Sequence, residues 1–413
     1  MLLYNSIRYS KSRSDGLAPE RIVAGKIHGL KQVLSDWLPD FQTHLAWLVA
    51  HDRGSEYKAG VDAASEWMLA KLQGLGCDTI VYPSDVYGSA IAGTLKGRGR
   101  GRVLLVSHLD TVWPEGTVLE WPFRIEGTRA EGPGVVDNAS GSLAGYYILK
   151  ALRQIDYDDF EEITLLCNGD EELGSPFSKE VIQCLAQGRD AAFILESPSN
   201  PNEIISQRAG LMYYDLRVAG KNAHVGVEPE KGHNAIMELC YKLSECNGVS
   251  GSNDVLTVNV STIAGGQRPN IVPDQAQAQI DVRVETLAEA DLVDARFHEI
   301  ADHIYVPGTS TTLNGGVAHP PMARGPKSAW LVELSQAIGR ELGINIKDTF
   351  CGGTSDGCYT ALVGTPTLCG LAPFGAQYHT RQEYLDLSSV VPRATLVAGL
   401  VVACTQEKSQ GNS

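Results

Sequence analysis

The fold of this chain is decided by the stretch VLLVSHLD at residues 103–110. Four consecutive apolar residues, 103–106, predict a short strand that is buried on both faces, as in a parallel sheet. The polar side chains of His108 and Asp110 follow directly after this strand. Because open α/β sheets form their sites outside the carboxyl ends of the strands, these two residues are the first candidates for a functional site.

Helices and buried strands alternate on both sides of this stretch. Apolar residues at helical spacing predict a helix that closes at Gly74, and short apolar runs predict further buried strands. The expected elements are helices over 58–74, 142–155 and 331–342 and strands over 103–106, 163–167, 192–195 and 367–371. This succession predicts an α/β fold built on a mostly parallel sheet.

The pattern changes between about residues 209 and 318. Residues 276–284 alternate strictly between apolar and polar side chains, so one face of this strand is buried and the other is solvated. The elements expected here are strands over 211–218, 255–263, 276–284 and 309–313, with helices around 236–243 and 293–300. The order β-α-β-β-α-β is typical of a ferredoxin-like α+β domain. We expect residues 1–208 and 319–413 to form one domain, interrupted by an inserted lid domain, 209–318.

The composition limits the classes of function. With 34 Lys and Arg against 49 Asp and Glu, the 413-residue chain has a net charge of −15, which disfavours a nucleic-acid or anionic-membrane surface. The nine cysteines lack C-x-x-C spacing, so neither a disulfide framework nor a thiolate zinc finger is predicted. No window approaches 18 consecutive apolar residues, so no transmembrane helix is expected, and the first 16 residues have no apolar core of signal-peptide length. We expect a cytoplasmic protein without nucleic-acid or membrane partners.

Polar residues gather at the ends of the predicted strands. They are His108, Asp110, Asp170, Glu171, Glu172, Glu196 and His379, with Asp137 in a further glycine-rich loop. Two imidazoles and several carboxylates, without thiolates, are the donor set expected for Zn²⁺ or a similar cation. The adjacent Glu171 and Glu172 can divide the work, one binding metal and one carrying a proton.

Each of these residues also has an ordinary structural explanation. An acidic triplet is commonly a solvated loop, a single histidine is commonly structural, and Asp137 beside Asn138 is compatible with a turn or a helix cap. His108 and Asp110, however, lie two apart on extended chain and point the same way, so that Asp110 can fix the tautomer of His108. The joint occurrence of such groups at successive strand ends favours a functional site.

With these residues in hand, the chain resembles the M20 family of metallopeptidases, nearest to its glutamate carboxypeptidase (carboxypeptidase G-like) branch. The matching strings occur in family order and cover roughly residues 40–405. They are SHLDTV (107–112), GPGVVD (132–137), DEELGS (170–175), ILE (194–196), GKNAH (220–224), RPNIVP (268–273), GGTSD (352–356) and YHT (378–380), with Glu383.

The resemblance implies a site with two zinc ions, or with other divalent cations such as Co²⁺ or Mn²⁺. The implied ligands are Asp137, bridging both ions, His108 and Glu196 on one of them, and Glu172 and His379 on the other. Glu171 would act as general base and then as acid, taking a proton from the bridging water and passing it to the leaving nitrogen. Asp110 would orient His108.

The resemblance also implies roles for the lid and for the pocket. Family members commonly dimerise through this domain, and a lid histidine, here His224, helps to hold the oxyanion in the partner's site. Asn270 and Arg283 match lid positions that contact substrate, and the backbone at Gly353 and Thr354 would line the pocket. His224 is alternatively a surface-loop histidine, and Arg283 is equally compatible with a structural salt bridge. Closure on a hinge near residues 208–210 and 317–319 would bring His224 and Arg283 toward the metals.

Three departures from the family pattern concern the substrate. The Lys-Gly-Gly that usually follows the bridging aspartate is absent, since residues 138–142 read NASGS. Residues 197–205 contain no Lys or Arg, where glutamate-releasing members carry a basic residue. The arginine at the entry to the final segment is replaced by His319, with Arg324 nearby. These departures leave the metal and catalytic residues intact but put a preference for glutamate in doubt.

We therefore expect an M20-type di-zinc hydrolase that cleaves an amide bond of a small peptide or N-acyl amino acid and releases a free C-terminal amino acid, with glutamate as a candidate. A specialised metabolite amide, and amide formation or transfer at the same site, are alternatives. A non-catalytic, metal-dependent ligand-binding scaffold is a third, although retention of Glu171 argues against it.

Overall fold

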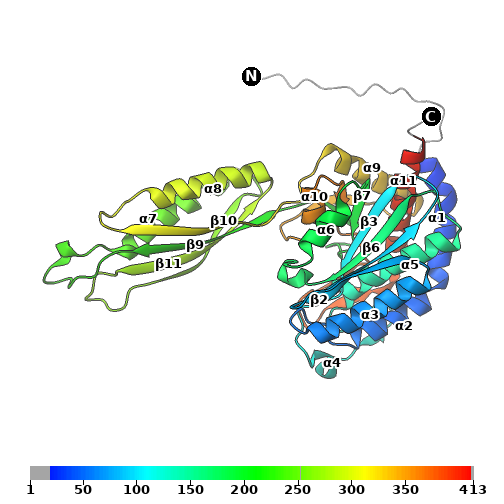
Figure 1. Ribbon diagram of the computed structural model, residues 1–413, viewed down its shortest axis with the longest axis horizontal. Coiled ribbons are helices and arrows are strands. Elements are labelled where there is room, and N and C mark those ends of the chain that lie inside the picture. Colours follow the sequence, from blue (N-terminus) through cyan, green and yellow to red (C-terminus); the bar gives the residue numbers. More distant parts are fainter. Residues whose placement is uncertain (1–18, 252, 411–413) are drawn as a thin grey trace, which may run out of the picture.

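A computed structural model describes residues 19–251 and 253–410 of the chain. Figure 1 shows two bodies: a larger one, in which a sheet lies between helices, and a smaller elongated one formed by the green and yellow middle of the chain. The chain enters the smaller body through strand β9 (Gly210–Ala219) and leaves it through β12 (Ser310–His319), which pairs with β9. The smaller body is therefore an insertion held on two neighbouring strands.

The larger body is built on a six-stranded sheet in the order β1-β2-β6-β3-β7-β14. Its strands are β1 (Asp78–Tyr82), β2 (Gly88–Lys96), β3 (Arg102–His108), β6 (Glu162–Gly169), β7 (Ala191–Ile194) and β14 (Thr367–Leu368). Four neighbours, β6, β3, β7 and β14, run parallel, whereas β2 is antiparallel to β6 and β1 to β2. The predicted α/β fold with a mainly parallel sheet is confirmed.

Helices cover both faces of this sheet (Figure 1). They are α1 (Pro19–Asp36), α2 (Leu38–Val49), α3 (Lys58–Gly74), α5 (Ser140–Gln154), α9 (Pro326–Glu341) and α11 (Val390–Gln410) around one hydrophobic cluster, and α6 (Lys179–Ala186) and α10 (Gly357–Leu362) around the other. Neighbouring strand residues contribute to opposite clusters: Leu104 and Val106 to one, Leu105 to the other. The segment Leu387–Gln406 is apolar and long enough to cross a membrane, but 83% of its most apolar window is buried within this body, as in a core helix.

Short elements complete the larger body. They are α4 (Thr117–Glu120), the parallel pair β8 (Glu203–Arg208) and β13 (Lys347–Cys351), and a small sheet of β4 (Arg124–Glu126), β5 (Arg129–Glu131), β15 (Gly375–Ala376) and β16 (Tyr384–Asp386). The last sheet brings the segment after residue 375 next to the loop that contains Asp137. Residues far apart in sequence are thereby placed side by side.

The inserted body is a four-stranded antiparallel sheet with two helices on one face. It consists of β9, α7 (Ala235–Asn247), β10 (Thr257–Gly265), β11 (Gln275–Val284), α8 (Leu287–Asp302) and β12, with strand order β10-β11-β9-β12. This is the predicted ferredoxin-like arrangement, and its hydrophobic cluster shares no residue with those of the larger body. We propose 209–318 as the extent of this lid, as the sequence pattern suggests.

Candidate active site

The end of β3 delivers the first two candidate residues. His108 is the last residue of the strand and is only 1% exposed, and Asp110 is completely buried. The ring Nδ1 of His108 lies 3.3 Å from Asp110 Oδ1 and 3.2 Å from the Asp110 carbonyl oxygen. Asp110 therefore fixes the imidazole on its Nδ1 side, and the ring Nε2 faces Asp137 and Glu196.

Asp110 is a hub that joins three segments of the chain. Its carboxylate accepts hydrogen bonds from the Ser55 hydroxyl at 2.7 Å and from the backbone N–H groups of Glu171 (3.2 Å) and Glu172 (3.1 Å). The single 3₁₀ turn Glu171–Leu173 that follows β6 is thereby fixed beside His108. This arrangement fits the orienting role expected for Asp110.

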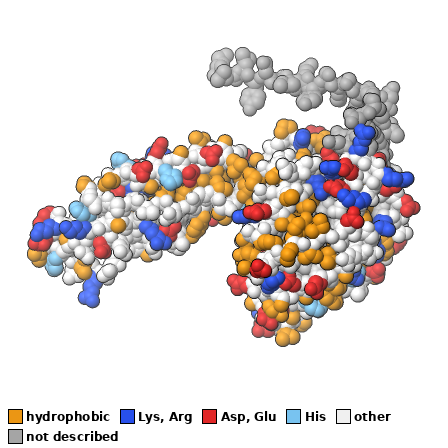
Figure 2. All heavy atoms as spheres, in the orientation of Figure 1, with side chains coloured by type: hydrophobic (Ala, Val, Ile, Leu, Met, Phe, Trp, Pro, Cys, Tyr) orange, Lys and Arg blue, Asp and Glu red, His pale blue; other side chains and the backbone are white. Residues whose placement is uncertain are grey.

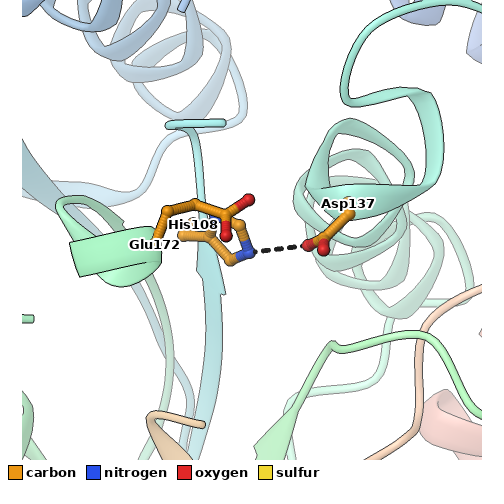
Figure 3. A group of neighbouring side chains, drawn as sticks. All are labelled: His108, Asp137 and Glu172. Atoms are coloured by element: carbon orange, nitrogen blue, oxygen red, sulfur yellow. Dashed lines mark hydrogen bonds and ion pairs between the residues drawn. The ribbon is translucent and has the colours of Figure 1, made fainter. Parts of the chain in front are cut away.

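Asp137 lies between two imidazole–carboxylate pairs. Its Oδ1 is 3.1 Å from His108 Nε2, which is also 3.4 Å from Glu196 Oε1. Its Oδ2 is 3.3 Å from His379 Nε2, which is 3.1 Å from Glu172 Oε2. Figure 3 shows Asp137 facing His108, with Glu172 beside the imidazole. The five side chains expected as ligands thus lie together, grouped into the two sets that the family resemblance implies.

The loop that carries Asp137 is held by one buried carboxylate. Glu383 is 1% exposed and accepts hydrogen bonds from the backbone N–H groups of Gly134 (3.2 Å), Val136 (3.0 Å) and Asp137 (3.1 Å). Burial raises the pKa of Glu383 to about 7, with the charge of Asp137 adding to the effect. Sequence reasoning noted Glu383 only as part of a motif; its loop contacts depend on tertiary pairing.

The donor set fits divalent cations. Donor atoms bonded to one tetrahedral zinc ion at about 2.0–2.2 Å are about 3.3 Å apart, close to the spacings around Asp137. Atoms of His108, Asp137 and Glu172 lie within 4.8 Å of one another, and Glu172 Oε1 is buried without a hydrogen-bond partner. Hydrogen bonds that the His379 ring donates to the carboxylates of Asp137 and Glu172 raise the pKa of His379 to about 10. The carboxylates thus concentrate negative charge that protons or cations must balance.

Glu171 lies at the same site without joining these contacts. Within the described residues its carboxylate forms no ion pair with His108 or His379. Burial raises the pKa of Glu171 well above its usual range, and the charges of Glu196 and Asp356 raise it further. A carboxyl group with a raised pKa is suited to accepting and returning a proton near neutral pH.

The cavity at the site has a volume of about 370 Å³. Its lining consists of Asp137, Glu171, Glu172, Glu196, Ser197, Ser199, Ile205, Arg208, Cys351, Gly353, Thr354, Tyr378 and His379. The predicted pocket residues Gly353 and Thr354 are therefore at the site. Among these residues, only Arg208 and His379 can carry positive charge.

Arg208 is the residue that sequence reasoning missed, having named it only as part of the expected hinge. Its side chain is buried and donates to the carbonyl oxygens of Gly353 (3.0 Å) and Thr354 (3.2 Å) and to Cys369 Sγ (3.2 Å). No carboxylate of the described residues lies within ion-pair distance of it. Its position as the only Lys or Arg between Arg189 and Arg217 was the available signal.

The other candidate cations have partners or are neutral. Arg283 binds both carboxylate oxygens of Asp281, at 2.9 and 3.0 Å, and donates to the Gly352 carbonyl at 3.3 Å. This geometry favours the salt-bridge alternative for Arg283. Burial lowers the pKa of His319 to about 4, and Arg324 is paired with Asp348 at 3.0 Å. Neither residue replaces the family arginine as a free cation in this cavity.

His224 and Asn270 lie together at the tip of the lid. The Val225 N–H donates to the Asn270 carbonyl at 3.2 Å, and both predicted side chains are exposed. Strand β9 separates this tip from Gly210, and ten residues of strand extend about 33 Å. Figure 1 shows the lid pointing away from the larger body, so neither residue reaches the cavity of its own chain. Because both side chains are exposed, they are accessible to a second molecule.

Comparison with known proteins identifies the family. A model of peptidase family M20/M25/M40 matches residues 104–403. The chain is 31% identical to carboxypeptidase G2 of Pseudomonas sp. (strain RS-16) over 90% of this chain and 91% of that one. It is 26% identical to succinyl-diaminopimelate desuccinylase of Bordetella parapertussis over 72% and 81% of the two chains.

Solved structures agree with this fold. Aminopeptidase PepT of Bacillus cereus superposes with a TM-score of 0.76 at 21% identity, over 89% of this chain and 98% of that one. A dinuclear metal-binding peptidase of the M20 family from Bacillus subtilis gives 0.66 at 14% identity, over 89% and 98%. On its sequence match and its carboxylate–imidazole site, the chain belongs to peptidase family M20/M25/M40 and is a metallohydrolase of that type.

Proposed function

We propose that this protein is a di-zinc amidohydrolase that releases a carboxylate-bearing amino acid from a small peptide or an N-acyl amino acid. The observation that carries the proposal is the position of Asp137 between two imidazole–carboxylate pairs, His108 with Glu196 and His379 with Glu172. When bound there, two zinc ions would supply a water of lowered pKa and a Lewis acid for the scissile carbonyl.

The residues of the chain carry the proton. Glu171 takes a proton from the attacking water and returns it to the leaving nitrogen, for which its raised pKa is suited. Asp110 positions this step, because it holds the imidazole of His108 and the backbone N–H of Glu171 at the same time. A single carboxylate hub thus fixes both a ligand and the base.

Arg208 is proposed as the anchor for the carboxylate of the released amino acid. It lines the cavity together with Glu171, and it has hydrogen bonds only to carbonyl oxygens and thiols in the described part of the chain. A buried guanidinium without an acidic partner gains strongly from binding a substrate carboxylate. Glutamate remains one candidate product among such amino acids.

We further propose a homodimer in which the lid tip completes the partner's site. The length of β9 separates His224 from the start of its own lid. His224 is also exposed, as a residue that acts on a second subunit must be. We expect the enzyme in the cytoplasm, with zinc as its metal and Co²⁺ or Mn²⁺ as possible replacements.

The proposal is tested by metal analysis combined with a substrate panel. We expect about two zinc ions per chain and release of a free amino acid from at least one dipeptide or N-acyl amino acid. Glu171→Gln should keep the metal content but lower kcat by at least about 10³-fold, since the proton carrier is lost. Full activity of Glu171→Gln would refute the mechanism, and two bound metals without turnover would favour the scaffold alternative.

A further inference from the structure

Part of the cavity at the candidate active site lies beyond the expected metal ligands and Glu171. Arg208, the proposed anchor for the carboxylate of the released amino acid, belongs to this part. The side chain of that amino acid branches from the carbon next to the carboxylate, so it must lie against the neighbours of Arg208. The side chains that can receive it form what we call the leaving-group wall: Ser197, Ser199, Ile205, Cys351 and Tyr378.

The leaving-group wall contains no acidic or basic side chain. It offers the hydroxyl groups of Ser197 and Ser199, the apolar side chain of Ile205 and the thiol of Cys351. Burial raises the pKa of Tyr378 to about 12, so its hydroxyl is neutral, and it donates to a backbone carbonyl oxygen at 3.0 Å. The wall can therefore pack against an apolar side chain or hydrogen-bond an uncharged polar one, but it offers no cation to an anion.

The leaving-group wall is held by a buried arginine that does not line the cavity. Arg393 is 1% exposed and donates to the carbonyl oxygens of Pro201 (3.3 Å) and Glu203 (2.9 Å), in the segment that follows the two serines. The Ser197 hydroxyl accepts a hydrogen bond from the Gly375 N–H at 3.2 Å. The wall is thus preformed, and the guanidinium that supports it is engaged with backbone carbonyls.

No free cation stands beside the wall to bind a second carboxylate. Arg283, at the Gly352 carbonyl, is neutralised by Asp281. Burial holds the pKa of His319 at about 4, so its ring is neutral at pH 7, and it packs on the Tyr359 ring at 4.5 Å. A second carboxylate on the leaving amino acid would lose water without gaining a cation, which is unfavourable.

We propose that the enzyme releases amino acids with uncharged side chains and discriminates against glutamate and aspartate. The inference rests on the proposed amide hydrolysis and narrows its substrate class. It also gives a meaning to the absence of Lys and Arg from residues 197–205: the site has changed its leaving group, and the catalytic residues are kept. Arg208 then binds the one carboxylate that all such products share.

The first test compares two leaving groups of nearly equal size that differ in charge. The substrates are N-acetyl-L-glutamine and N-acetyl-L-glutamate, together with the dipeptides alanyl-glutamine and alanyl-glutamate. With the zinc-loaded enzyme we expect kcat/KM for the glutamine form to exceed that for the glutamate form at least about tenfold in each pair. Equal rates, or faster release of glutamate, would overturn the inference.

Adding a cation to the leaving-group wall supplies an independent test. Ser199 is exposed, so Ser199→Lys should fold, and it should raise the glutamate-to-glutamine ratio of kcat/KM at least about tenfold. Ser35→Lys makes the same substitution on an exposed serine of α1 that does not line the cavity, and the ratio should stay unchanged. A rise common to both variants, or none in Ser199→Lys, would contradict the assignment.

Binding separates this inference from the proposed function. Calorimetry on zinc-loaded Glu171→Gln with N-acetyl-L-glutamine and N-acetyl-L-glutamate reports the leaving-group wall without turnover. Tighter binding of the glutamine form, with a smaller difference once Ser199→Lys is added, would support the assignment even if no substrate were hydrolysed. Equal binding, or tighter binding of the glutamate form, would refute it even in an active hydrolase.

Discussion

At the residue scale, the site is an arrangement of negative charge around few cations. Asp137 and its carboxylate neighbours share two imidazoles, while Arg208 stands apart with carbonyl and thiol partners. Among the cavity residues, the buried guanidinium of Arg208 is therefore the group that a bound anion would stabilise most. Arg283 differs in this respect, because its charge is already neutralised by Asp281.

Replacing Arg208 tests its role as a carboxylate anchor. Arg208→Gln should raise KM for substrates with a free carboxylate by roughly 10- to 100-fold, equivalent to about 1.4–2.7 kcal/mol, with a smaller effect on kcat. The matched Arg283→Gln variant should change KM less than about threefold, since that side chain is already paired. Steady-state kinetics with a free acid and its amide measure this. An equal loss on both substrates would indicate a structural role instead.

The sequence predicted which side chains meet at the site better than it predicted the contacts around them. Imidazole and carboxylate chemistry at strand ends is visible in single residues such as His108 and Glu196, because local strand patterns place them. The roles of Arg208 and Glu383 are set by contacts with residues more than 140 positions away, such as Gly353 for the first and Gly134 for the second. Apart from the isolation of Arg208 in a stretch without other Lys or Arg, no local pattern carries that information.

At the element scale, prediction succeeded where the hydrophobic period is uninterrupted. The helix expected over 58–74 is α3 with the same limits, and the strand over 276–284 is β11 to within one residue. The strand expected over 309–313 is wrong in length, because β12 continues to His319 through Gly315 and Gly316. These glycines interrupt the alternation, and Gly315 is required since a Cβ atom there would lie 2.0 Å from the Tyr213 carbonyl oxygen.

The strand expected over 367–371 is likewise wrong in length, since β14 comprises only Thr367 and Leu368. The chain then turns at Gly370, which has a φ of +65°. Cys369 pairs its backbone with Ile205, outside the main sheet. The apolar run reflects burial rather than a continuous ladder.

A fully buried ion pair within α7, whose lysine also binds the end of α8, should control lid stability. Lys242 lies 3.0 Å from Glu238 and donates to the carbonyl oxygens of Ile300 and Ala301 at the end of α8. Lys242→Met would leave Glu238 buried without its cation and unsatisfied carbonyls beside it, at a cost of about 3–5 kcal/mol.

Hydrogen exchange of β9 and β11 measures this loss directly. Exchange there should become faster in Lys242→Met, while β3 and β6 of the larger body keep their protection. The matched control is Lys231→Met, which removes an exposed ion pair with Glu228 and should leave hydrogen exchange in the lid unchanged. Unchanged exchange in the lid would show that the pair contributes little.

At the scale of the whole molecule, the separation between lid tip and cavity predicts complementation between subunits. Glu171→Gln and His224→Ala are each expected to be poorly active alone. In a random mixture, half of the dimers combine one chain of each kind and hold one complete site, so about a quarter of wild-type activity should return. Mixing the purified variants after a mild dissociation step measures this. No recovery, despite mixed dimers shown by mass spectrometry, would exclude action of His224 across subunits.

Because the lid joins the larger body only through the paired strands β9 and β12, a small rotation at this connection moves the lid tip by a large distance. A rotation of about 10° at Gly210 would displace the tip of an arm of about 33 Å by about 6 Å, enough to make or break a hydrogen bond across the proposed dimer. Arg208 is the last residue of β8, two positions before Gly210, and its backbone N–H donates to the Met322 carbonyl oxygen. A substrate carboxylate bound to Arg208 would therefore act at this pivot. Substrate binding in one subunit would then change the orientation of its lid, and with it the position of the lid tip in the active site of the other subunit of the proposed dimer.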